Sequence, residues 1–242
     1  MHVVVTGASQ GIGRATALRL AQNRAALALH YHRHSDEARK LAQEVAERRC
    51  ECFTVQADLA APDGPREIAG AITQAWDRVD VLILNAGTYP RRRFQDLSPS
   101  EFLDCFRLHV FGPAELVQRL LPLLERSPSG RVIFVSSVLA FSGSRHGAHY
   151  AGAKAAQLGL ARSLALELAP RITVNVVVPG SIDTAILAGD SPEQHIQRER
   201  AIPLGRIGRP EEVAEAIAFL ASPGAAYLTG TTIHVNGGLR FD

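Results

Sequence analysis

Hydrophobic residues recur along this chain in short runs, separated by longer stretches with the periodicity of helices. The apolar runs, which are typical of buried strands, lie at residues 3–5, 26–31, 52–56, 80–84, 131–135, 172–178 and 232–235. The helix-like stretches lie at about 11–23, 35–48, 63–77, 99–125, 148–169 and 210–221. Because strands that alternate with helices over short connections form strand–helix–strand units, the pattern predicts a parallel sheet covered on both faces.

The length and the connections of the chain indicate one domain. Its 242 residues contain no repeat, no low-complexity tract and no Ser/Gly linker. We therefore expect a single α/β domain over 1–242, a Rossmann-type doubly wound parallel sheet of seven strands with helices on both faces. Residues 185–202 combine Gly, Asp, Ser and Pro with several charges, and they are typical of a mobile lid helix over a substrate site.

Composition and charge exclude several classes of function. Hydrophobic residues make up 46% and charged residues 21%, an ordinary globular composition, and the net charge of +2 argues against a nucleic-acid partner. No run is long enough to span a membrane, and the N-terminus has no signal-peptide pattern. The three cysteines have no metal-like spacing, so we expect reduced thiols, no metal site and a cytoplasmic protein.

The chemistry centres on Tyr150-Ala-Gly-Ala-Lys154. Two residues four apart on a helix lie on the same face, so a phenol stands beside an ammonium. The positive charge is expected to lower the phenol pKa from about 10, which suits a group that donates and recovers a proton. The chain contains 24 arginines and only two lysines, Lys40 and Lys154, so a lysine at this place favours chemistry over a solvated helix face.

A glycine-rich turn, Thr6-Gly-Ala-Ser-Gln-Gly-Ile-Gly13, lies between the first strand and the first helix. Glycines let the backbone approach a phosphate closely, and the helix N-terminus offers free N–H groups and a positive dipole. No Gly-Lys-Ser/Thr follows, which excludes a nucleoside-triphosphate P-loop. The turn therefore predicts a dinucleotide site.

The end of the second strand, His30-Tyr-His-Arg33, indicates which dinucleotide is bound. An acid at this place accepts a hydrogen bond from a ribose 2′-hydroxyl, whereas a base accommodates a 2′-phosphate. No acid occurs before Asp36, while His32 and Arg33 are bases. The segment therefore favours NADP(H), and the alternating histidines lack the partners of a metal site.

Polar or small residues follow the other predicted strands. Ligands of open α/β sheets bind at the carboxyl ends of the strands, so these residues are candidates for the site. A hydroxyl at such an end, as at Ser137, can hydrogen-bond a substrate carbonyl that gains negative charge. The segments concerned are Asp58-Leu59, Asn85-Ala-Gly87, Ser136-Ser137 and Pro179-Gly180. The run Arg91-Arg-Arg93 fits a solvated loop better than an anion site.

Taken in order, these motifs resemble the short-chain dehydrogenase/reductase family over nearly the full length. The matching segments are Thr6–Gly13, Asp58-Leu59, Asn85–Gly87, Ser137, Tyr150–Lys154, Pro179-Gly180 and Val235–Gly238. The resemblance is strongest to carbonyl reductases of the 3-oxoacyl-carrier-protein-reductase type. It implies hydride transfer between NADP(H) and a carbonyl or secondary alcohol, with a small-molecule or acyl-carrier substrate.

The resemblance also implies a role for each matching residue. Tyr150 is the general acid or base, Ser137 polarises the carbonyl, and Lys154 holds the nicotinamide ribose. Tyr31, His32 and Arg33 face the 2′-phosphate. The other residues implied to bind the coenzyme are Gly7, Ser9, Gln10, Gly11, Ile12, Gly13, Asp58, Leu59, Asn85, Ala86, Gly87, Tyr150, Lys154, Pro179, Gly180, Ile182 and Thr184.

One residue departs from the family pattern. Relatives carry an Asn that helps to hold a water between the lysine and solvent, and this chain has His109. Two hypotheses remain: a neutral, packed imidazole, or a titrating member of the proton relay. A neighbouring ammonium is expected to lower the pKa of His109 below about 6.5 by like-charge repulsion.

The same sequence leaves three alternative functions to consider and predicts an oligomeric state. A redox-inactive dinucleotide sensor and a dehalogenase-like lyase share the fold, but Ser137, Tyr150 and Lys154 favour an oxidoreductase. The segment His30–Arg33 resembles pteridine reductases, although those enzymes carry Asp where this chain has Ser137. The helices at 99–125 and 148–169 are apolar around much of their circumference, so we expect a homotetramer, or at least a dimer.

Overall fold

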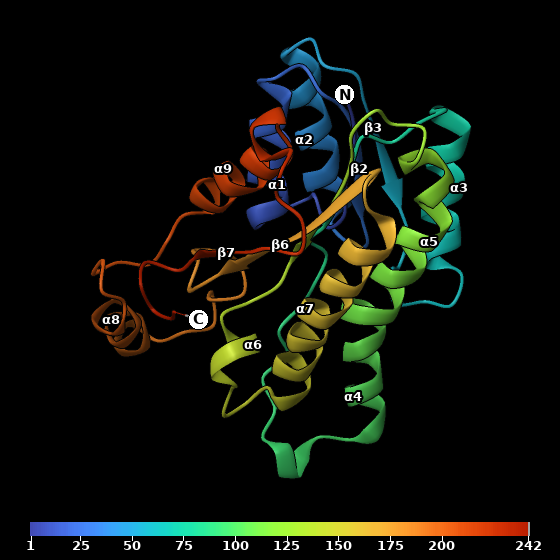
Figure 1. The fold of residues 1–242 in the computed structure, drawn as a ribbon. Helices are drawn as coiled ribbons and strands as arrows, with labels where there is room; N and C mark the ends of the chain where they lie inside the picture. The colour runs from blue at the N-terminus through green and yellow to red at the C-terminus, as the bar shows by residue number, and fades with distance from the viewer. Residues whose placement is uncertain (242) are drawn as a thin grey trace.

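The computed structural model describes residues 1–241, and their core is one parallel sheet with the strand order β3-β2-β1-β4-β5-β6-β7 (Figure 1). The strands are β1 (His2–Val5), β2 (Ala26–Tyr31), β3 (Cys52–Gln56), β4 (Val81–Leu84), β5 (Gly130–Val135), β6 (Ile172–Pro179) and β7 (Thr232–Val235). The predicted seven-stranded parallel sheet is confirmed, and each strand lies within two residues of its predicted bounds.

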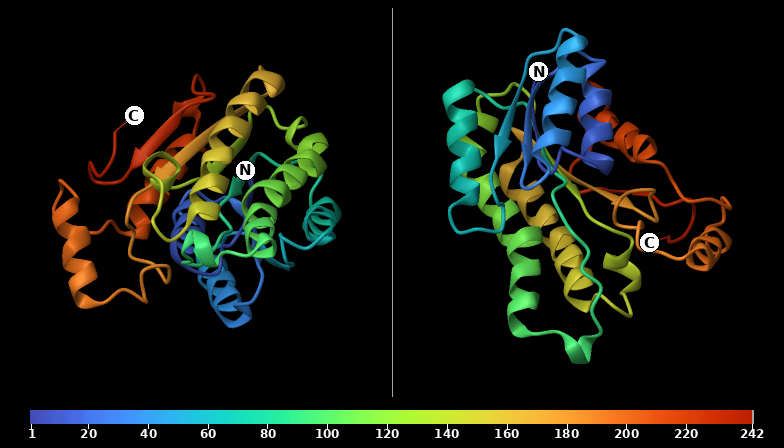
Figure 2. Two further views of the ribbon diagram at one scale, coloured as in Figure 1. Left: turned by 90° about the horizontal axis from the view of Figure 1, so that it is seen from below. Right: turned by 180° about the vertical axis from the view of Figure 1, so that it is seen from behind.

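Helices cover both faces of the sheet (Figures 1 and 2). One face is covered by α1 (Gly11–Ala21), α2 (Ser35–Glu47) and α9 (Pro210–Leu220). The other is covered by α3 (Gly64–Ala75), α5 (Gly112–Leu124) and α7 (Ala148–Leu168). The short or peripheral helices are η1 (Phe94–Asp96), α4 (Pro99–Phe106), η2 (Arg107–Phe111), α6 (Leu139–Ser142), α8 (Pro192–Ala201) and η3 (Pro223–Ala225).

Strands at the centre of the sheet, such as β4, are apolar because both of their faces are buried, whereas the edge strands β3 and β7 also carry polar residues. In β1, Val4 packs with the core beneath α3, α5 and α7, whereas Val3 and Val5 pack with the core beneath α1, α2 and α9. Successive side chains of a strand point to opposite faces, so a two-sided sheet needs unbroken apolar runs rather than alternation. The apolar runs in the sequence are therefore typical of a sheet that is covered on both faces.

The order of the strands determines where the site lies. The chain builds β1, β2 and β3 outward in one direction, and then returns to place β4 on the other side of β1. The loops after β1 and β4 therefore diverge and leave a crevice at the carboxyl ends of the strands. The glycine-rich turn and Asn85–Gly87 meet at this edge, where the Asn85 side-chain amide donates to the carbonyls of Thr6 and Gly7 at 2.9 and 3.1 Å.

The predicted continuous helix at 99–125 is interrupted. It consists of α4, a π-helical turn at η2 and α5. Pro113 has no N–H to donate to the carbonyl of His109 four residues earlier, so the regular ladder cannot continue there. The Gln157 side-chain amide of α7 donates to this His109 carbonyl at 2.8 Å instead. The π turn thus places His109 against the catalytic helix α7.

The segment predicted as a lid contains one helix. It is α8, which begins with a capping box between Ser191 and Gln194 and projects from the body of the molecule (Figures 1 and 2). The preceding residue, Asp190, is buried and pairs with Arg198 of α8 at 2.5 Å and with Arg91 of the loop after β4 at 2.6 Å. The pair with Arg91 ties the segment to the loop after β4, whereas the pair with Arg198 lies within the segment.

Candidate active site

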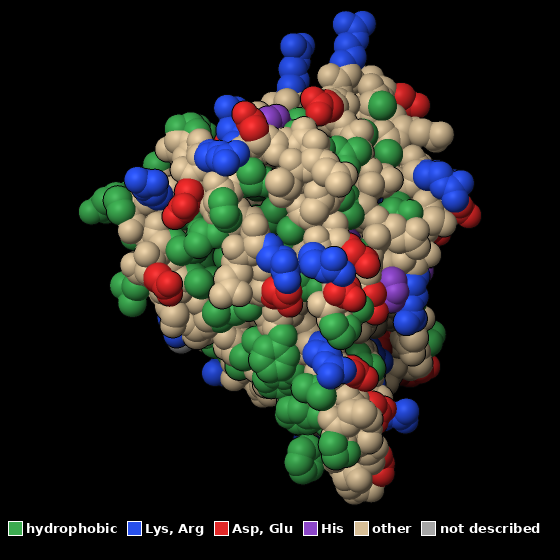
Figure 3. All heavy atoms as spheres, turned by 90° about the vertical axis from the view of Figure 1, so that its right-hand side faces the viewer, with side chains coloured by type: hydrophobic (Ala, Val, Ile, Leu, Met, Phe, Trp, Pro, Cys, Tyr) green, Lys and Arg blue, Asp and Glu red, His purple; other side chains and the backbone are tan. Residues whose placement is uncertain are grey.

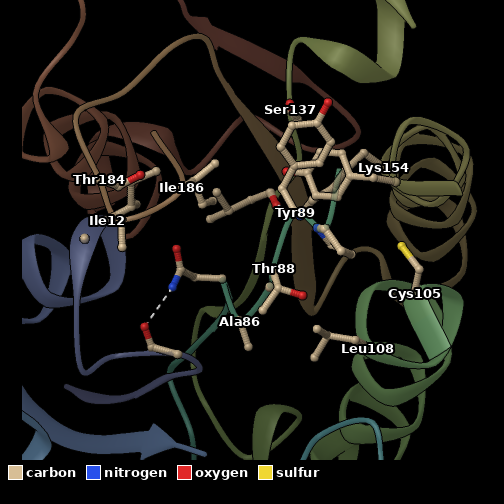
Figure 4. Close-up of a pocket in the computed structure, with 18 of the residues that line it drawn as sticks. Ile12, Ala86, Thr88, Tyr89, Cys105, Leu108, Ser137, Lys154, Thr184 and Ile186 are labelled. Atoms are coloured by element: carbon tan, nitrogen blue, oxygen red, sulfur yellow. Dashed lines mark hydrogen bonds between the residues drawn. The ribbon is translucent and has the colours of Figure 1, made fainter. Parts of the chain in front are cut away.

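A cleft of about 1000 Å³ runs along the carboxyl edge of the sheet (Figure 4). Most of the residues predicted for coenzyme and catalysis line this cleft, including Ser137, Tyr150 and Lys154. Gly13, Tyr31 and His109 lie outside its lining. The tertiary structure thus brings together segments from Gly7 to Thr184, nearly the full length of the chain.

The glycine-rich turn fits a phosphate group. Gly7 and Gly11 adopt left-handed backbone angles, with φ of +63° and +54°, which favour glycine. A side chain at Gly13 would collide with the carbonyl oxygen of Gly7, so this glycine allows α1 to pack against the turn rather than lining the cleft. No side chain caps the N-terminus of α1, and its first N–H groups are therefore free for an anion.

His30 supports this turn from below. Its Nε2 lies 3.1 Å from the carbonyl of Ala57, and because a carbonyl only accepts, Nε2 carries the proton. Its Nδ1 then accepts from the backbone N–H of Gly7 at 3.2 Å. Burial lowers the pKa of His30 to about 4, which keeps the ring neutral and the acceptor intact. From the sequence, His30 was considered on its own only as a metal ligand, and its structural role was not predicted. Its position in a strand buried on both faces was the available signal.

The residues predicted to face a 2′-phosphate divide into two groups. His32 and Arg33 are exposed and line the end of the cleft. Tyr31 instead directs its hydroxyl to the Gln56 side chain at 3.3 Å, outside the cleft lining. The contact of Tyr31 with the coenzyme therefore stays a prediction.

The reaction end of the cleft combines a hydroxyl, a phenol and an amine. The Ser137 hydroxyl interacts with the phenol of Tyr150. Lys154 Nζ lies 5.6 Å from the centroid of the Tyr150 ring and donates to the Val135 carbonyl at 2.7 Å. The neighbouring Ser136 serves a different purpose, because its hydroxyl donates to the Lys154 backbone carbonyl at 2.8 Å and secures α7 to β5.

Burial dominates the ionisation of this group. The sequence predicted a lowered pKa for Tyr150, but burial raises it, and the Ser137 hydroxyl offsets this only in part. Burial also lowers the pKa of Lys154 to about 7, so its positive charge is weakened at neutral pH. The predicted effect of the ammonium is therefore absent here, because desolvation outweighs the attraction between phenolate and ammonium.

His109 lies beneath the reaction end. Its ring meets the Tyr150 ring edge to face, with centroids 5.2 Å apart. Its Nε2 donates to the Thr88 carbonyl at 3.0 Å, while Nδ1 is buried without a hydrogen-bond partner in the described protein. Burial, followed by the charge of Lys154, lowers its pKa well below the usual value. The predicted direction is confirmed, and the ring is neutral.

Two residues that belong to no sequence motif, Tyr89 and Ile186, complete the site. Tyr89 follows β4, and its ring lies 4.6 Å from the Tyr150 ring between centroids. Figure 4 shows Tyr89 and Ile186 in the same pocket as Ser137 and Lys154. Arg91 is neither free in solvent nor available for an anion, because it pairs with Asp190. No sequence motif marks Tyr89 or Ile186, because their contacts join loops that are distant in the sequence.

Comparison with known proteins agrees with the resemblance found in the sequence motifs, over nearly the full length of the chain. A family model described as enoyl-(acyl carrier protein) reductase matches residues 7–240. A 3-oxoacyl-[acyl-carrier-protein] reductase of Staphylococcus epidermidis is 36% identical over 237 residues, covering 98% of this chain and 97% of the relative.

Solved structures agree with these relatives. A short chain dehydrogenase from Burkholderia cenocepacia in complex with NADP has a TM-score of 0.92 at 30% identity, covering 98% of this chain and 96% of that one. The angucycline C-6 ketoreductase LanV with bound NADP has a TM-score of 0.93 at 31% identity, covering 98% and 95%. Fold, cleft and relatives together define an α/β oxidoreductase of the dinucleotide-binding class. Within that class, the chain belongs to the short-chain dehydrogenase/reductase family.

Two further observations concern residues 1–241. None of their helices has the length and apolar character needed to cross a bilayer. No group of three or more His, Cys, Asp or Glu side chains among them is placed to hold a metal ion.

Proposed function

We propose that this protein is an NADP(H)-dependent oxidoreductase that interconverts a carbonyl and a secondary alcohol. The observation that carries the proposal is the grouping of Ser137, Tyr150 and Lys154 at one end of a cleft whose other end fits a dinucleotide. The coenzyme, when bound, supplies or accepts the hydride. The protein contributes position, proton transfer and electrostatics.

Each residue of the group has a distinct task. The Tyr150 phenol donates a proton to the carbonyl oxygen as negative charge develops there, and it recovers the proton in the reverse direction. The Ser137 hydroxyl, which already contacts that phenol, donates to the same oxygen. Lys154 lies one helical turn from Tyr150 at the reaction end of the cleft, where the nicotinamide ribose would lie, and its ammonium favours the phenolate once protonated.

Three observations support NADP(H) over NAD(H). His32 and Arg33 line the ribose end of the cleft, and no acid occurs between β2 and Asp36. The two solved relatives described above contain NADP. His32 also lies 3.8 Å from Asp58, which leaves Arg33 as the fully available cation. We therefore assign the preference chiefly to Arg33.

The substrate that we propose is a ketone, either a small molecule or a 3-oxoacyl group on a carrier. The Staphylococcus relative acts on a 3-oxoacyl carrier-protein substrate by its name, and LanV is named a ketoreductase. Two hydroxyl groups directed to one point suit a carbonyl oxygen better than a carbon–carbon double bond. Ser137 also argues against the pteridine-reductase alternative, and an intact proton donor argues against a redox-inactive sensor.

The test compares the wild type with Tyr150→Phe, which removes only the transferable proton. Ketones and 3-oxoacyl thioesters are screened while NADPH absorbance is followed. We expect turnover to fall at least ~100-fold in the variant, with NADPH affinity, measured by fluorescence titration, nearly unchanged. Near-normal activity of Tyr150→Phe on a good substrate would reject the proposed mechanism.

We also propose a homotetramer, or at least a dimer, assembled through α4, α5 and α7. Phe102, Leu103, Phe111 and Leu166 are exposed large hydrophobic residues of these helices and the π turn between them. Figure 3 shows hydrophobic side chains gathered toward the lower part of this side of the molecule, where α4 lies. Water-exposed apolar surface of this kind favours association. A monomeric mass by light scattering at micromolar concentration would contradict the assembly.

A further inference from the structure

Tyr89 occupies a position in the cleft that the proposed chemistry does not require. It lies in the loop after β4, and its ring packs on Tyr150 at a tilt of 46°. The phenol of Tyr89 is among the groups that raise the pKa of Tyr150, so the two hydroxyl groups are close. Figure 4 shows the Tyr89 ring projecting into the pocket from the same loop as Thr88.

Two other segments, the loop between α6 and α7 and the stretch before α8, help to hold the Tyr89 ring and its loop in place. Its hydroxyl hydrogen-bonds the Ser144 hydroxyl at 2.6 Å, in the loop between α6 and α7. The Arg91 guanidinium lies 5.7 Å from the ring centroid and pairs with the buried Asp190 before α8. The Arg92 backbone N–H also donates to the His146 carbonyl at 2.9 Å. The ring is therefore a fixed wall and not a loose side chain.

Gly147 provides the space for this wall. A Cβ atom at Gly147 would lie 2.5 Å from Cε2 and 3.1 Å from the hydroxyl oxygen of Tyr89. The φ of Gly147 is −174°, an extended angle that any residue adopts, so its backbone does not call for glycine. The tightest contacts of an added side chain would be with Tyr89, followed by the Ser144 hydroxyl oxygen at 3.2 Å.

The consequence is a narrow approach to the proton donor. Tyr150 is 7% exposed, and its ring is packed among Cys105, Ala153 and Leu139 as well as Tyr89. A ketone must reach the Tyr150 hydroxyl along the remaining open side. A group on the carbonyl carbon that points toward the Tyr89 side of this approach would meet its ring, which packs directly on Tyr150.

We propose that Tyr89 is a specificity-determining residue that walls one side of the Tyr150 hydroxyl and selects ketones with a slender, unbranched substituent over those with a ring or branch at the carbonyl carbon. This inference rests on the proposed function. One group added to or removed from a close-fitting pocket changes selectivity about 10- to 200-fold.

The experiment compares two thioesters that differ only at the ketone, a straight-chain 3-oxoacyl thioester and its 3-oxo-3-phenyl analogue. The measured quantity is the ratio of kcat/KM for the phenyl substrate to that for the straight-chain substrate. We expect Tyr89→Ala to raise this ratio at least ~tenfold. Tyr89→Phe keeps the ring and is expected to stay within about threefold of wild type, as for loss of one ordinary hydrogen bond.

Gly147→Ala gives an independent route to the same change. Its methyl group displaces the Tyr89 ring while leaving every catalytic side chain in place, so the ratio should rise as in Tyr89→Ala. In the double variant, the methyl has no ring to displace, and the ratio should match that of Tyr89→Ala alone. Gly70→Ala, at an exposed glycine of α3 with no atom within 4 Å of the added Cβ, is the matched control.

A binding measurement separates this inference from the proposed function. Both thioesters are titrated calorimetrically into the Tyr150→Phe protein saturated with NADP⁺, with and without Tyr89→Ala. If the wild type reduces no carbonyl, the proposed function fails, and the ratio of the two affinities still decides the role of Tyr89. The inference is overturned if Tyr89→Ala leaves the ratio of phenyl to straight-chain affinity within about twofold of that of the parent protein. The ratio of kcat/KM, wherever turnover is measured, must then be unchanged to the same degree. An opposite shift in Gly147→Ala also overturns the inference.

Discussion

The coenzyme end and the reaction end of the cleft each adjoin a buried, neutral histidine. The two histidines differ in the hydrogen bonding of one ring atom, Nδ1. His30 and His109 both donate from Nε2 to a backbone carbonyl, of Ala57 and Thr88 respectively. At the coenzyme end, Nδ1 of His30 accepts the N–H of Gly7. At the reaction end, Nδ1 of His109 is buried without a partner in residues 1–241.

Nδ1 of His30 is thus an acceptor whose hydrogen bond holds the fold, whereas Nδ1 of His109 is an acceptor whose hydrogen bond is not used by the fold. A buried polar atom without a hydrogen bond costs about 1–3 kcal/mol, so a satisfied one is expected wherever rigidity is the only requirement. His30 meets that expectation and holds the glycine-rich turn. His109 does not, which fits a place where the acceptor is used during the reaction, beside Tyr150 and Lys154.

The largest expected effect comes from Lys154. On the proposal that it holds the nicotinamide ribose and supports Tyr150 electrostatically, Lys154→Ala should impair coenzyme binding and proton transfer together. We expect kcat/KM to fall at least ~1000-fold, with NADPH affinity clearly weakened in a fluorescence titration. Unchanged NADPH affinity would show that the lysine acts at the reaction end alone.

The second prediction concerns stability and His30. Its pKa is about 4 in the folded protein and about 6.5 when unfolded, so the unfolded chain binds the proton first. Stability from neutral His30 is complete above pH 6.5 and is lost as pH falls toward 4, by about 3 kcal/mol. Urea unfolding at several pH values should show this loss in the wild type.

The matched variant is His30→Leu, which fills the buried space and does not titrate. It should be less stable at neutral pH, because the Gly7 N–H loses its acceptor, and it should show a smaller decline between pH 6.5 and 4. Parallel curves for the two proteins would mean that His30 is not the titrating group.

The third prediction tests the coenzyme end. Arg33 is the cation available for a 2′-phosphate, and an acid at position 31 would favour a ribose hydroxyl. Tyr31→Asp combined with Arg33→Ala should shift the ratio of kcat/KM from NADP(H) toward NAD(H) by at least ~tenfold, as for loss of a charge-assisted contact.

The control for this pair is Arg48→Ala, which removes an exposed arginine at the end of α2. It should leave the coenzyme ratio unchanged. Equal efficiency of the wild type with both coenzymes would contradict the assignment of Arg33.

The smallest expected effect is that of His109. His109→Asn keeps a polar side chain and should retain activity, whereas His109→Phe fills the space without an acceptor and should lose roughly tenfold, about 1.4 kcal/mol in the transition state. A relay in which the ring titrates predicts an inflection below neutrality in the pH profile of carbonyl reduction, which His109→Asn erases. The lowered pKa places any such inflection well below neutrality. If the Phe variant matches the wild type in rate and profile, His109 only packs.

The sequence was sufficient to predict the sheet and most of the residues that line the cleft. Two-sided burial requires unbroken apolar strands, and a phosphate-binding turn requires glycines at set places, so both leave a local signal in the chain. Ser137, Tyr150 and Lys154 could be named for the same reason, because each occupies a fixed place on a strand end or a helix face. The chain itself also showed that Arg33 and not an acid follows β2.

Only the tertiary structure decided the remaining features. The π turn at His109 depends on Gln157 reaching a carbonyl freed by Pro113, and the Tyr89 wall depends on Ser144 and Gly147 across the cleft. The ionisation of Tyr150 was mispredicted because a sequence shows the neighbouring Lys154 but not the burial that outweighs it. Desolvation and contacts between distant loops are properties of the packed molecule, and no local pattern encodes them.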